Sequence, residues 1–455
     1  MEDQPNNQNK GFGYWLSYSV TAKLIFIGFL LIILLIPQVW VSGLIGERQQ
    51  LQQETISEIT RNWGAGQEFG GPVLVVPYTY YEKSQADGKE TLKAVSSNLY
   101  LLPEMLEVTG EIHPEVRYRS IYEAVVYNSN LKVKGRFGGI ELKKSGIIAE
   151  NLQWERARVI LGISDLKGLR NSPEFVLDNE KYPVEMDTYN TSLFENNLMA
   201  IPDFSKLTSG QHEFSFGLDL RGSDVIRIKP LGKANEVTLR GNWSDPKFEG
   251  DYLPEKREVA ADKFEASWSV PYFNRNIPQQ WLAAGTELKN SIEAIPDQDG
   301  PDFLGVKFLL PVDNYQKTTR TVKYALLVIG LTFVSLFFTE ILVRRRIHPI
   351  QYMLIGAAMT IYYTLLLSLS EYLGFSAAYG IASVSTILLI AAFLKAILKS
   401  SRTAGLFAAI LSVFYLFIFV IMQLQTLSLL IGSIGLFVIV ALLMYFSNKV
   451  NWEKS

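Results

Sequence analysis

Apolar residues form long uninterrupted runs near both ends of the chain and short alternating stretches in between. A run of about 20 apolar residues, folded as a helix, crosses the roughly 30 Å hydrocarbon core of a bilayer. The pattern therefore predicts a multi-pass α-helical membrane protein with six transmembrane helices. We expect these helices at residues 24–45, 324–343, 350–373, 375–394, 404–422 and 427–446.

The first apolar run, residues 24–45, follows a polar cytoplasmic tail at residues 1–23. A cleaved signal peptide is the alternative, because Val41-Ser42-Gly43 resembles a cleavage site. The apolar part of a signal peptide spans only about 7–15 residues, so we favour an uncleaved anchor. Pro37 is expected to kink this helix. Residues 46–63 then place apolar side chains at helical spacing, which predicts an amphipathic stem.

Residues 64–322 alternate in the manner of short strands bounded by Gly, Pro, Asn or Asp. We expect a large, mainly antiparallel β domain that is sandwich-like and consists of one or two units. A short helix is expected within it at residues 278–295. Residues 323–447 form the five-helix membrane domain, and residues 448–455 form a second cytoplasmic tail.

Cations in the short connections between the apolar runs predict the orientation. They cluster in alternate connections, and the connections between these clusters contain no Lys or Arg. Because cytoplasmic loops carry an excess of Lys and Arg, we expect both termini in the cytoplasm and residues 47–322 outside it. The residues that determine this topology are Arg344, Arg345, Arg346, Lys395, Lys399 and Arg402.

The composition excludes several classes of chemistry. The chain of 455 residues has no cysteine, three histidines and a net charge of −2. Disulfides, thiolate metal sites and cysteine nucleophiles are therefore excluded, and no basic stripe indicates nucleic-acid binding. Phosphate-loop, zinc-protease and serine-hydrolase motifs are also absent from the sequence. We expect no catalytic residues, no metal and no cofactor, and hence a protein that is not an enzyme.

Two carboxylates interrupt the C-terminal apolar region, Glu340 and Glu371. Glu340 lies four residues before Arg344, a spacing that favours an ion pair at the membrane interface over a functional role. Glu371 follows Ser368 and Ser370 near the outer end of its span. It is either an ordinary interfacial residue or an acceptor for a proton, an ion or a partner helix, and the sequence leaves both readings open.

His348 precedes Pro349 at the start of the third span, where the first turn of a helix is expected. Gln351 and Tyr352 follow three and four residues later, so the three side chains are expected on one face. Capping of the helix and contact with lipid headgroups are the favoured roles of His348. A histidine that titrates near neutral pH is the alternative.

A recognisable series is formed by residues 62–78, 117–137 and 264–279 and by the membrane motif LLLSLSEYLGF. In this order, these stretches resemble the CreD family, bacterial inner-membrane proteins that are described as cell-envelope integrity or colicin-tolerance proteins. Tyr372 replaces the histidine expected in many relatives, which weakens any role that needs a titrating histidine beside Glu371. The membrane positions that match the family are Glu340, His348, Pro349, Gln351, Tyr352, Ser368, Ser370, Glu371, Gly374 and Phe375.

The resemblance implies a multi-pass protein of the bacterial inner membrane with a large periplasmic domain, residues 47–322. The expected function is non-enzymatic support of cell-envelope integrity and the stress response, including colicin tolerance, with the β domain as an interaction module. The expected partners are the lipid bilayer and periplasmic or envelope proteins or cell-wall components, and not nucleic acid. The alternative is a transporter or channel for a lipid, an ion or an envelope precursor that uses the Glu371 region.

Overall fold

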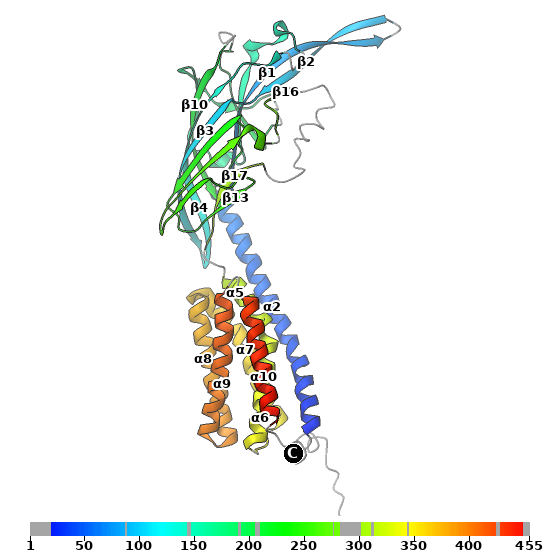
Figure 1. Cartoon of the computed structure of the whole chain (residues 1–455), viewed down its shortest axis with the longest axis vertical. Coiled ribbons are helices and arrows are strands. Elements are labelled where there is room, and N and C mark those ends of the chain that lie inside the picture. The colour runs from blue at the N-terminus through cyan, green and yellow to red at the C-terminus, as the bar shows by residue number, and fades with distance from the viewer. Residues whose placement is uncertain are drawn as a thin grey trace, which may run out of the picture. The chain divides into compact units, whose positions relative to one another are not determined.

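Helices occupy the apolar ends of the chain, and strands occupy the alternating region between them (Figure 1). The computed structural model describes residues 20–86, 89–142, 147–189, 193–204, 210–275, 277–282, 302–310, 314–343, 345–424 and 428–448. The chain divides into a helical unit, Met1–Gln53 with Pro311–Ser455, and a β unit, Glu54–Leu310.

The apolar stretches form α2 (Val20–Trp63), α5 (Asn314–Lys323), α6 (Ala325–Val343), α7 (Pro349–Leu373), α8 (Phe375–Leu398), α9 (Ser401–Gln423) and α10 (Ser428–Asn448). Within the described ranges, α2, α7, α8 and α9 are each long and apolar enough to cross a membrane. Helices α5 and α6 meet at a bend of 44° and together form a fifth candidate span, whereas α10 is apolar over Leu430–Leu442. The described residues therefore contain four to five candidate membrane spans, fewer than the six predicted.

Helix α2 is one continuous helix of 44 residues (Figure 1). It begins at Val20, so Lys23, which the sequence pattern assigns to the polar tail, lies inside the helix. The helix continues through Pro37, and the expected anchor and stem are parts of this single element. One face of the helix packs in the helical unit, because its buried apolar side chains recur every three or four residues. These side chains are Ile27, Leu30, Leu34, Val41 and Ile45.

The β unit contains two sheets. The nine-stranded sheet has the order β13 (Pro246–Gly250), β17 (Leu304–Phe308), β11 (Val225–Ile228), β1 (Gln67–Ala86), β5 (Arg158–Ile163), β9 (Asn196–Ala200) and β8 (Glu185–Met186), with β2 (Lys89–Leu101) on β1 and β16 (Gln280–Leu282) on β2. The eight-stranded sheet has the order β14 (Lys256–Val259), β15 (Phe264–Pro271), β12 (Ala234–Gly241), β3 (Met105–Arg119), β4 (Tyr122–Phe137), β10 (His212–Ser223), β6 (Glu174–Leu177) and β7 (Glu180–Pro183).

The sheets are mixed, although most neighbouring strands are antiparallel as expected. Strand β1 pairs with β11 in parallel, and β3 pairs with β12 in parallel. Parallel neighbours need a long crossover between them, and here more than 100 residues separate the paired strands. Local sequence patterns report hairpins but not such distant pairings, so the parallel pairs could not be predicted.

One hydrophobic core is shared by both sheets. Along β3 and β10, buried and more exposed residues alternate, as expected for strands with one face on a core. Leu74 and Leu101 from the nine-stranded sheet belong to the same cluster as Leu131 and Phe214 from the eight-stranded sheet. The two sheets of the β unit therefore share a common core.

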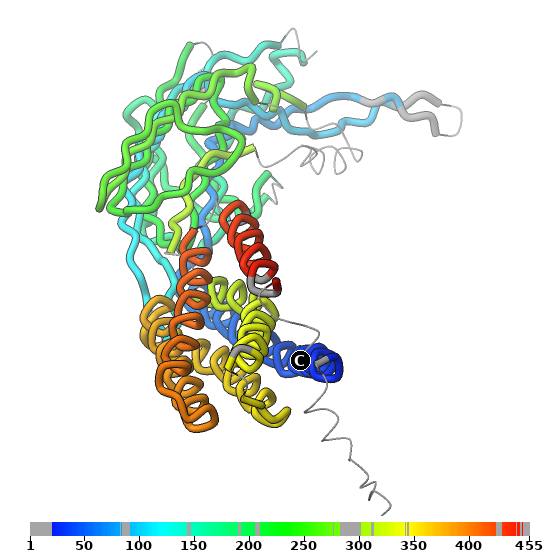
Figure 2. Tube along the Cα trace, turned by 60° about the horizontal axis from the view of Figure 1, so that its bottom comes forward, coloured from blue at the N-terminus to red at the C-terminus, as the bar shows by residue number. Residues whose placement is uncertain are grey.

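The β1–β2 hairpin extends beyond the neighbouring strands (Figures 1 and 2). Its ladder continues to the pair Ala86–Lys89, whereas β5 pairs with β1 only as far as Val75. Tyr81 and Leu92 are exposed on this projecting part. Such a two-stranded ribbon receives little support from other strands of the sheet.

Residues 278–295 do not form the expected helix where the structure describes them. Residues Gln280–Leu282 form β16, which adds to the edge of β2, and Trp281 stacks on Tyr100 with ring centroids 5.1 Å apart. Strand pairing and aromatic packing therefore prevail over the local helical spacing at this site. Residues 283–295 lie outside the described residues.

Tyr127 on β4 links the two sheets through its buried hydroxyl group. The hydroxyl donates a hydrogen bond to the carbonyl of Val225 on β11 at 2.8 Å. It also accepts a hydrogen bond from the backbone amide of Gln67 on β1 at 3.3 Å. Burial raises the pKa of the Tyr127 phenol well above its usual value.

We predict that Tyr127→Phe lowers the free energy of unfolding by about 1–3 kcal/mol, because both backbone groups lose this partner. In the wild type, the raised pKa means that stability falls as pH rises above about 10, where the tyrosine of the unfolded chain ionises. The variant should therefore show a smaller loss of stability at alkaline pH. Denaturant unfolding of the full chain, followed by tryptophan fluorescence at about pH 8 and about pH 11, measures both effects.

Tyr81→Phe is the matched control, because the side chain of Tyr81 is exposed. An equal loss of stability in the Tyr81 and Tyr127 variants would contradict the linking role of Tyr127.

Candidate functional site

The two carboxylates of the C-terminal apolar region, Glu340 and Glu371, both pair with cations of α2. Glu340 pairs with Lys23 near the start of that helix, and Glu371 pairs with Arg48 further along it. At 1.5 Å of rise per residue, the two α2 positions are about 38 Å apart, which is longer than a typical hydrocarbon core. Each carboxylate therefore lies near a different end of the helical unit.

Glu340 of α6 is the centre of a buried network of hydrogen bonds. Its Oε1 accepts hydrogen bonds from the Lys23 ammonium group and from the backbone amide of Ile347, the latter at 3.1 Å. Its Oε2 accepts a hydrogen bond from the Tyr352 hydroxyl on α7 at 3.0 Å. The ring of Phe333 packs edge-on against Tyr352, with centroids 5.9 Å apart. The network thus joins α2, α6 and α7.

Among the described residues, the charged partner of Glu340 is Lys23, and the expected ion pair with Arg344 stays a prediction. Arg344 lies outside the described residues, whereas Lys23 is 317 positions away in the chain. Lys23 is 4% exposed and Glu340 is 8% exposed, so both charges are largely removed from solvent. Two buried charges are tolerated when they neutralise each other and their remaining bonding capacity is used.

His348 caps α7, the favoured role for this residue. Its Nδ1 accepts a hydrogen bond from the Ile350 amide at 3.4 Å, and Pro349 occupies the first turn. In return, Oε1 of Gln351 accepts a hydrogen bond from the His348 amide at 2.9 Å. The pair forms a capping box, while Tyr352 turns to Glu340. The three side chains therefore do not form one shared polar site.

Glu371 near the end of α7 has partners on two other helices. Its Oε1 accepts a hydrogen bond from the Tyr315 hydroxyl on α5 at 2.9 Å and lies 3.5 Å from Nε of Arg48. The Glu371 side chain is 8% exposed, whereas the Arg48 side chain is 50% exposed. Solvent therefore screens this ion pair more than the pair of Glu340 with Lys23.

The serines before Glu371 do not join it in one site. The Ser370 hydroxyl donates to the Leu367 carbonyl of its own helix at 2.8 Å, and Ser368 is exposed. Asn314 instead organises this end of the unit. Its Oδ1 accepts a hydrogen bond from the Phe375 amide at 3.1 Å, next to Gly374, whose φ is +73°. This positive φ suits glycine and allows the close turn from α7 to α8.

The described cations of the short connections lie at the Lys23 end of the helical unit. Arg345 and Arg346 are exposed in the α6–α7 connection, beside the Glu340 network. Lys399 and Arg402 are exposed where α8 leads into α9. Because α7 and α8 run in opposite directions, these two connections share one end of the unit (Figure 1). Lys395, also exposed, lies in the last turn of α8.

Sequence reasoning missed three members of the two networks: Lys23, Arg48 and Tyr315. The sequence does contain a pattern that places Lys23 on the buried face of the helix. Ile27 and Leu30 follow it at four- and three-residue spacing, and both are buried. Arg48 follows the first apolar run and lies in the interval that was interpreted as a stem. No local pattern pairs either residue with a carboxylate more than 300 positions away.

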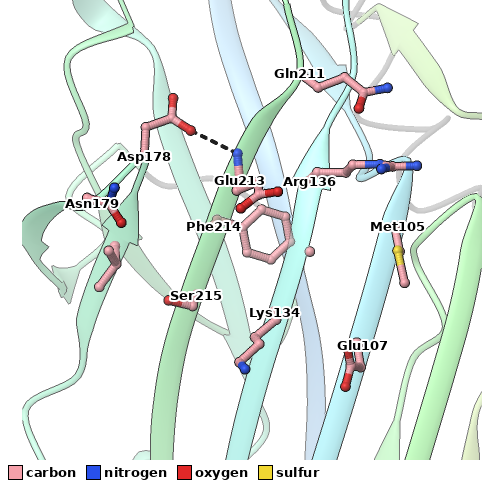
Figure 3. Close-up of a pocket in the computed structure, with 12 residues that line it drawn as sticks. Met105, Glu107, Lys134, Arg136, Asp178, Asn179, Gln211, Glu213, Phe214 and Ser215 are labelled. Carbon is pink, nitrogen blue, oxygen red and sulfur yellow. Dashed lines mark hydrogen bonds between the residues drawn. The ribbon is translucent and has the colours of Figure 1, made fainter.

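The outer face of the eight-stranded sheet contains a second candidate site, a polar groove of about 680 Å³ (Figure 3). Lys134 and Arg136 of β4 lie in it beside Glu107 of β3 and Glu213 of β10. Charges of both signs line the groove, so its electrostatics favour neither anions nor cations. In the described part of the chain, no three His, Asp or Glu side chains gather as metal ligands.

A family model described as "Inner membrane protein CreD" matches residues 19–453. The chain belongs to the CreD family. The inner membrane protein CreD of Escherichia coli (strain K12) is 29% identical to it over 423 residues, which cover 92% of this chain and 91% of the relative. The resemblance inferred from the sequence is thereby confirmed. This CreD-family chain is a membrane protein in which Glu340, Tyr352 and Glu371 are bound to other helices.

We predict that Lys23→Met and Glu340→Gln each lower the free energy of unfolding, and that the Lys23 variant loses about 3–5 kcal/mol. The loss arises because Lys23→Met leaves a buried carboxylate without its counter-charge. The double variant should be more stable than the sum of the two single effects implies, since no unpaired charge remains. Thermal unfolding of the full chain in detergent micelles measures this coupling.

Lys395→Met is the matched control, because Lys395 is exposed at the same end of the unit. Strictly additive effects of the Lys23 and Glu340 substitutions would contradict a buried ion pair.

Helices α2 and α7 pack closely at Gly356. A Cβ at Gly356 of α7 would lie 2.5 Å from Cδ1 of Leu34 on α2 and 2.9 Å from Cζ of Phe333 on α6. We predict that Gly356→Leu lowers stability by about 1–3 kcal/mol through overpacking. Gly380→Leu on α8, where nothing lies within 4 Å of the added Cβ, should preserve stability. Equal stability of the two variants in a thermal unfolding assay would rule out close packing at Gly356.

Proposed function

We propose that this CreD-family protein supports cell-envelope integrity and the envelope stress response without catalysing a reaction. In this proposal the β unit lies in the periplasm and acts as the interaction module for envelope proteins or cell-wall components. The helical unit crosses the inner membrane six times and anchors the β unit. Both chain termini are cytoplasmic.

The positions at which the chain leaves the helical unit are the observation that supports this proposal. Gln53 is the last residue of the N-terminal segment of the helical unit, and it follows Arg48 by five residues. Arg48 pairs with Glu371. Pro311, where the chain returns, precedes Asn314 by three residues, and Asn314 binds the α7–α8 turn. Both connections to the β unit therefore leave from the end opposite the cation-rich connections, and cation-rich connections are typically cytoplasmic.

The two carboxylate networks support an anchoring role over transport. Glu340 already accepts three hydrogen bonds, and Glu371 accepts one from Tyr315 beside Arg48. A carboxylate that carries ions or protons must release its partner during each cycle, which is costly for a buried ion pair. The observed contacts suit helices that stay together. We therefore assign Glu340 and Glu371 to the attachment of α2.

Site-directed labelling tests the proposed topology, and the chain is suited to it because it contains no cysteine. We predict that Lys256→Cys, at an exposed position of β14, reacts with a membrane-impermeant maleimide in intact spheroplasts. Ser401→Cys, exposed at the start of α9, should react only after permeabilisation. The reverse pattern would overturn the proposed orientation.

Complementation tests the proposed function in a strain that lacks the native gene. A chain in which a short Gly/Ser linker replaces Glu54–Leu310 should insert into the membrane but fail to restore resistance to cell-wall-active antibiotics or colicins. The control carries the same linker as an insertion at Asp262, an exposed residue between β14 and β15, and should restore resistance. Full resistance from the shortened chain would refute a role of the β unit as the interaction module.

A further inference from the structure

An apolar pocket of about 590 Å³ opens at one end of the core that the two sheets share. Its deep wall is formed by Leu74 and Leu101 of the nine-stranded sheet and by Phe137 of the eight-stranded sheet, all at most 3% exposed. Gly139 and Glu150 also line the pocket and are exposed. The pocket therefore leads from the surface of the β unit into its hydrophobic core, and its volume suits a small amphiphile.

His212, the first residue of β10, lines the same pocket and has an unused hydrogen-bonding function. Its Nδ1 lies 2.7 Å from Oδ2 of Asp178, whereas the buried Nε2 has no partner among the described residues. A carboxylate can only accept, so in the neutral imidazole the proton is on Nδ1 and Nε2 is an acceptor. A group that satisfies Nε2 must then be a hydrogen-bond donor.

Backbone hydrogen bonds hold Asp178 in place for this contact. Its Oδ1 accepts a hydrogen bond from the Glu213 amide at 2.9 Å (Figure 3), and its own amide donates to the Glu213 carbonyl at 2.9 Å. Asp178 also occupies the tight β6–β7 turn with a φ of +47°. The imidazole of His212 is thus oriented by a residue that is itself fixed to β10.

We propose that this pocket binds one acyl chain of a lipid whose headgroup carries a hydrogen-bond donor, a hydroxyl or an ammonium group. The apolar depth of the pocket takes the chain, and the headgroup donates to Nε2 of His212 at the wall. The exposed carboxylate of Glu150 adds a second acceptor beside the opening and disfavours a headgroup with a free carboxylate. This assignment goes beyond the proposed function and does not depend on the orientation of the membrane helices.

Several features favour a lipid over an apolar peptide as the occupant. The pocket is bounded by side chains of both sheets, and within the described residues it is not flanked by a free strand edge that a peptide could extend. The chain also belongs to a membrane protein, in which single-chain and two-chain lipids are the abundant apolar ligands. An acyl chain needs no backbone partners, whereas a buried peptide does.

Photolabelling of the full chain in nanodiscs tests the proposal. The probe is a long-chain monoacylglycerol that carries a diazirine near the end of its acyl chain, and the labelled peptides are identified by mass spectrometry. We expect labels on the peptides that contain Leu74, Leu101 or Phe137, and competition by unlabelled monoacylglycerol. Labels confined to the membrane helices, or equal competition by free glycerol, would overturn the proposal.

Two variants separate the acyl pocket from non-specific labelling. Gly139→Trp should reduce labelling of the core peptides by about tenfold, because an added Cβ at Gly139 meets no atom within 4 Å and a large side chain can fill the opening. Gly217→Trp is the control on the outer face of β10, outside this pocket, where an added Cβ makes only an ordinary contact of 3.8 Å. Equal labelling of the two variants would contradict an acyl site at this position.

His212→Phe tests the headgroup contact, because it keeps an aromatic ring in the wall and removes both nitrogen atoms. We expect labelling by the monoacylglycerol probe to fall by about three- to tenfold. Labelling by the matching fatty-acid methyl ester, which has no donor, should not change. An equal decrease for both probes would indicate a loss of pocket shape and would overturn the assigned role of His212.

Discussion

The buried ion pair between Lys23 and Glu340 is the interaction on which the arrangement of the helical unit depends. A single charge in an apolar surrounding is costly, so each of these residues requires the other. Because Lys23 is on α2 and Glu340 is on α6, satisfying the two charges brings together segments from opposite ends of the chain. Tyr352 then ties α7 to the same carboxylate through its hydroxyl group.

The second ion pair adds register to this packing, because Arg48 reaches Glu371 at the far end of α2. A shift of α2 by one turn would separate both pairs and leave the more deeply buried Lys23 without a counter-charge. Apolar contacts, such as the approach of Leu34 on α2 to Gly356 on α7, also pack the helices closely. A one-turn shift of α2 costs less at such contacts than at the ion pairs, because another apolar side chain can take the same place. Buried charges are thus well suited to select one alignment among several apolar ones.

Features of this structure that depend on residues close in sequence could be predicted, whereas contacts between distant segments could not. Apolar runs and the family motif predict the helices, because both are local, and His348 before Pro349 caps α7 as its position suggests. Sequence reasoning paired Glu340 only with its neighbour Arg344, because such reasoning detects local spacing. The contact of Glu340 with Lys23 and the parallel pairing of β1 with β11 both join distant segments. The Asp178–His212 pair also joins residues that are 34 positions apart in the sequence.

The two ends of α2 show how surroundings decide which chemistry holds a helix. Lys23 lies among apolar helices and is bound by the carboxylate of Glu340, which cancels its charge. Trp63, in the last turn, lies in the β unit between the guanidinium groups of Arg117 and Arg221, each 4.8 Å from its ring. There its indole nitrogen donates to the Tyr127 carbonyl at 3.3 Å. A half-buried aromatic ring attracts cations to its face while the cations stay partly in solvent. An ion pair within the apolar helices, in contrast, requires that both charges be buried. Helix α2 therefore requires a charge at its beginning and an aromatic ring at its end. Replacing Lys23 with Trp would leave Glu340 without its counter-charge, and replacing Trp63 with Lys would leave Arg117 and Arg221 without the aromatic ring.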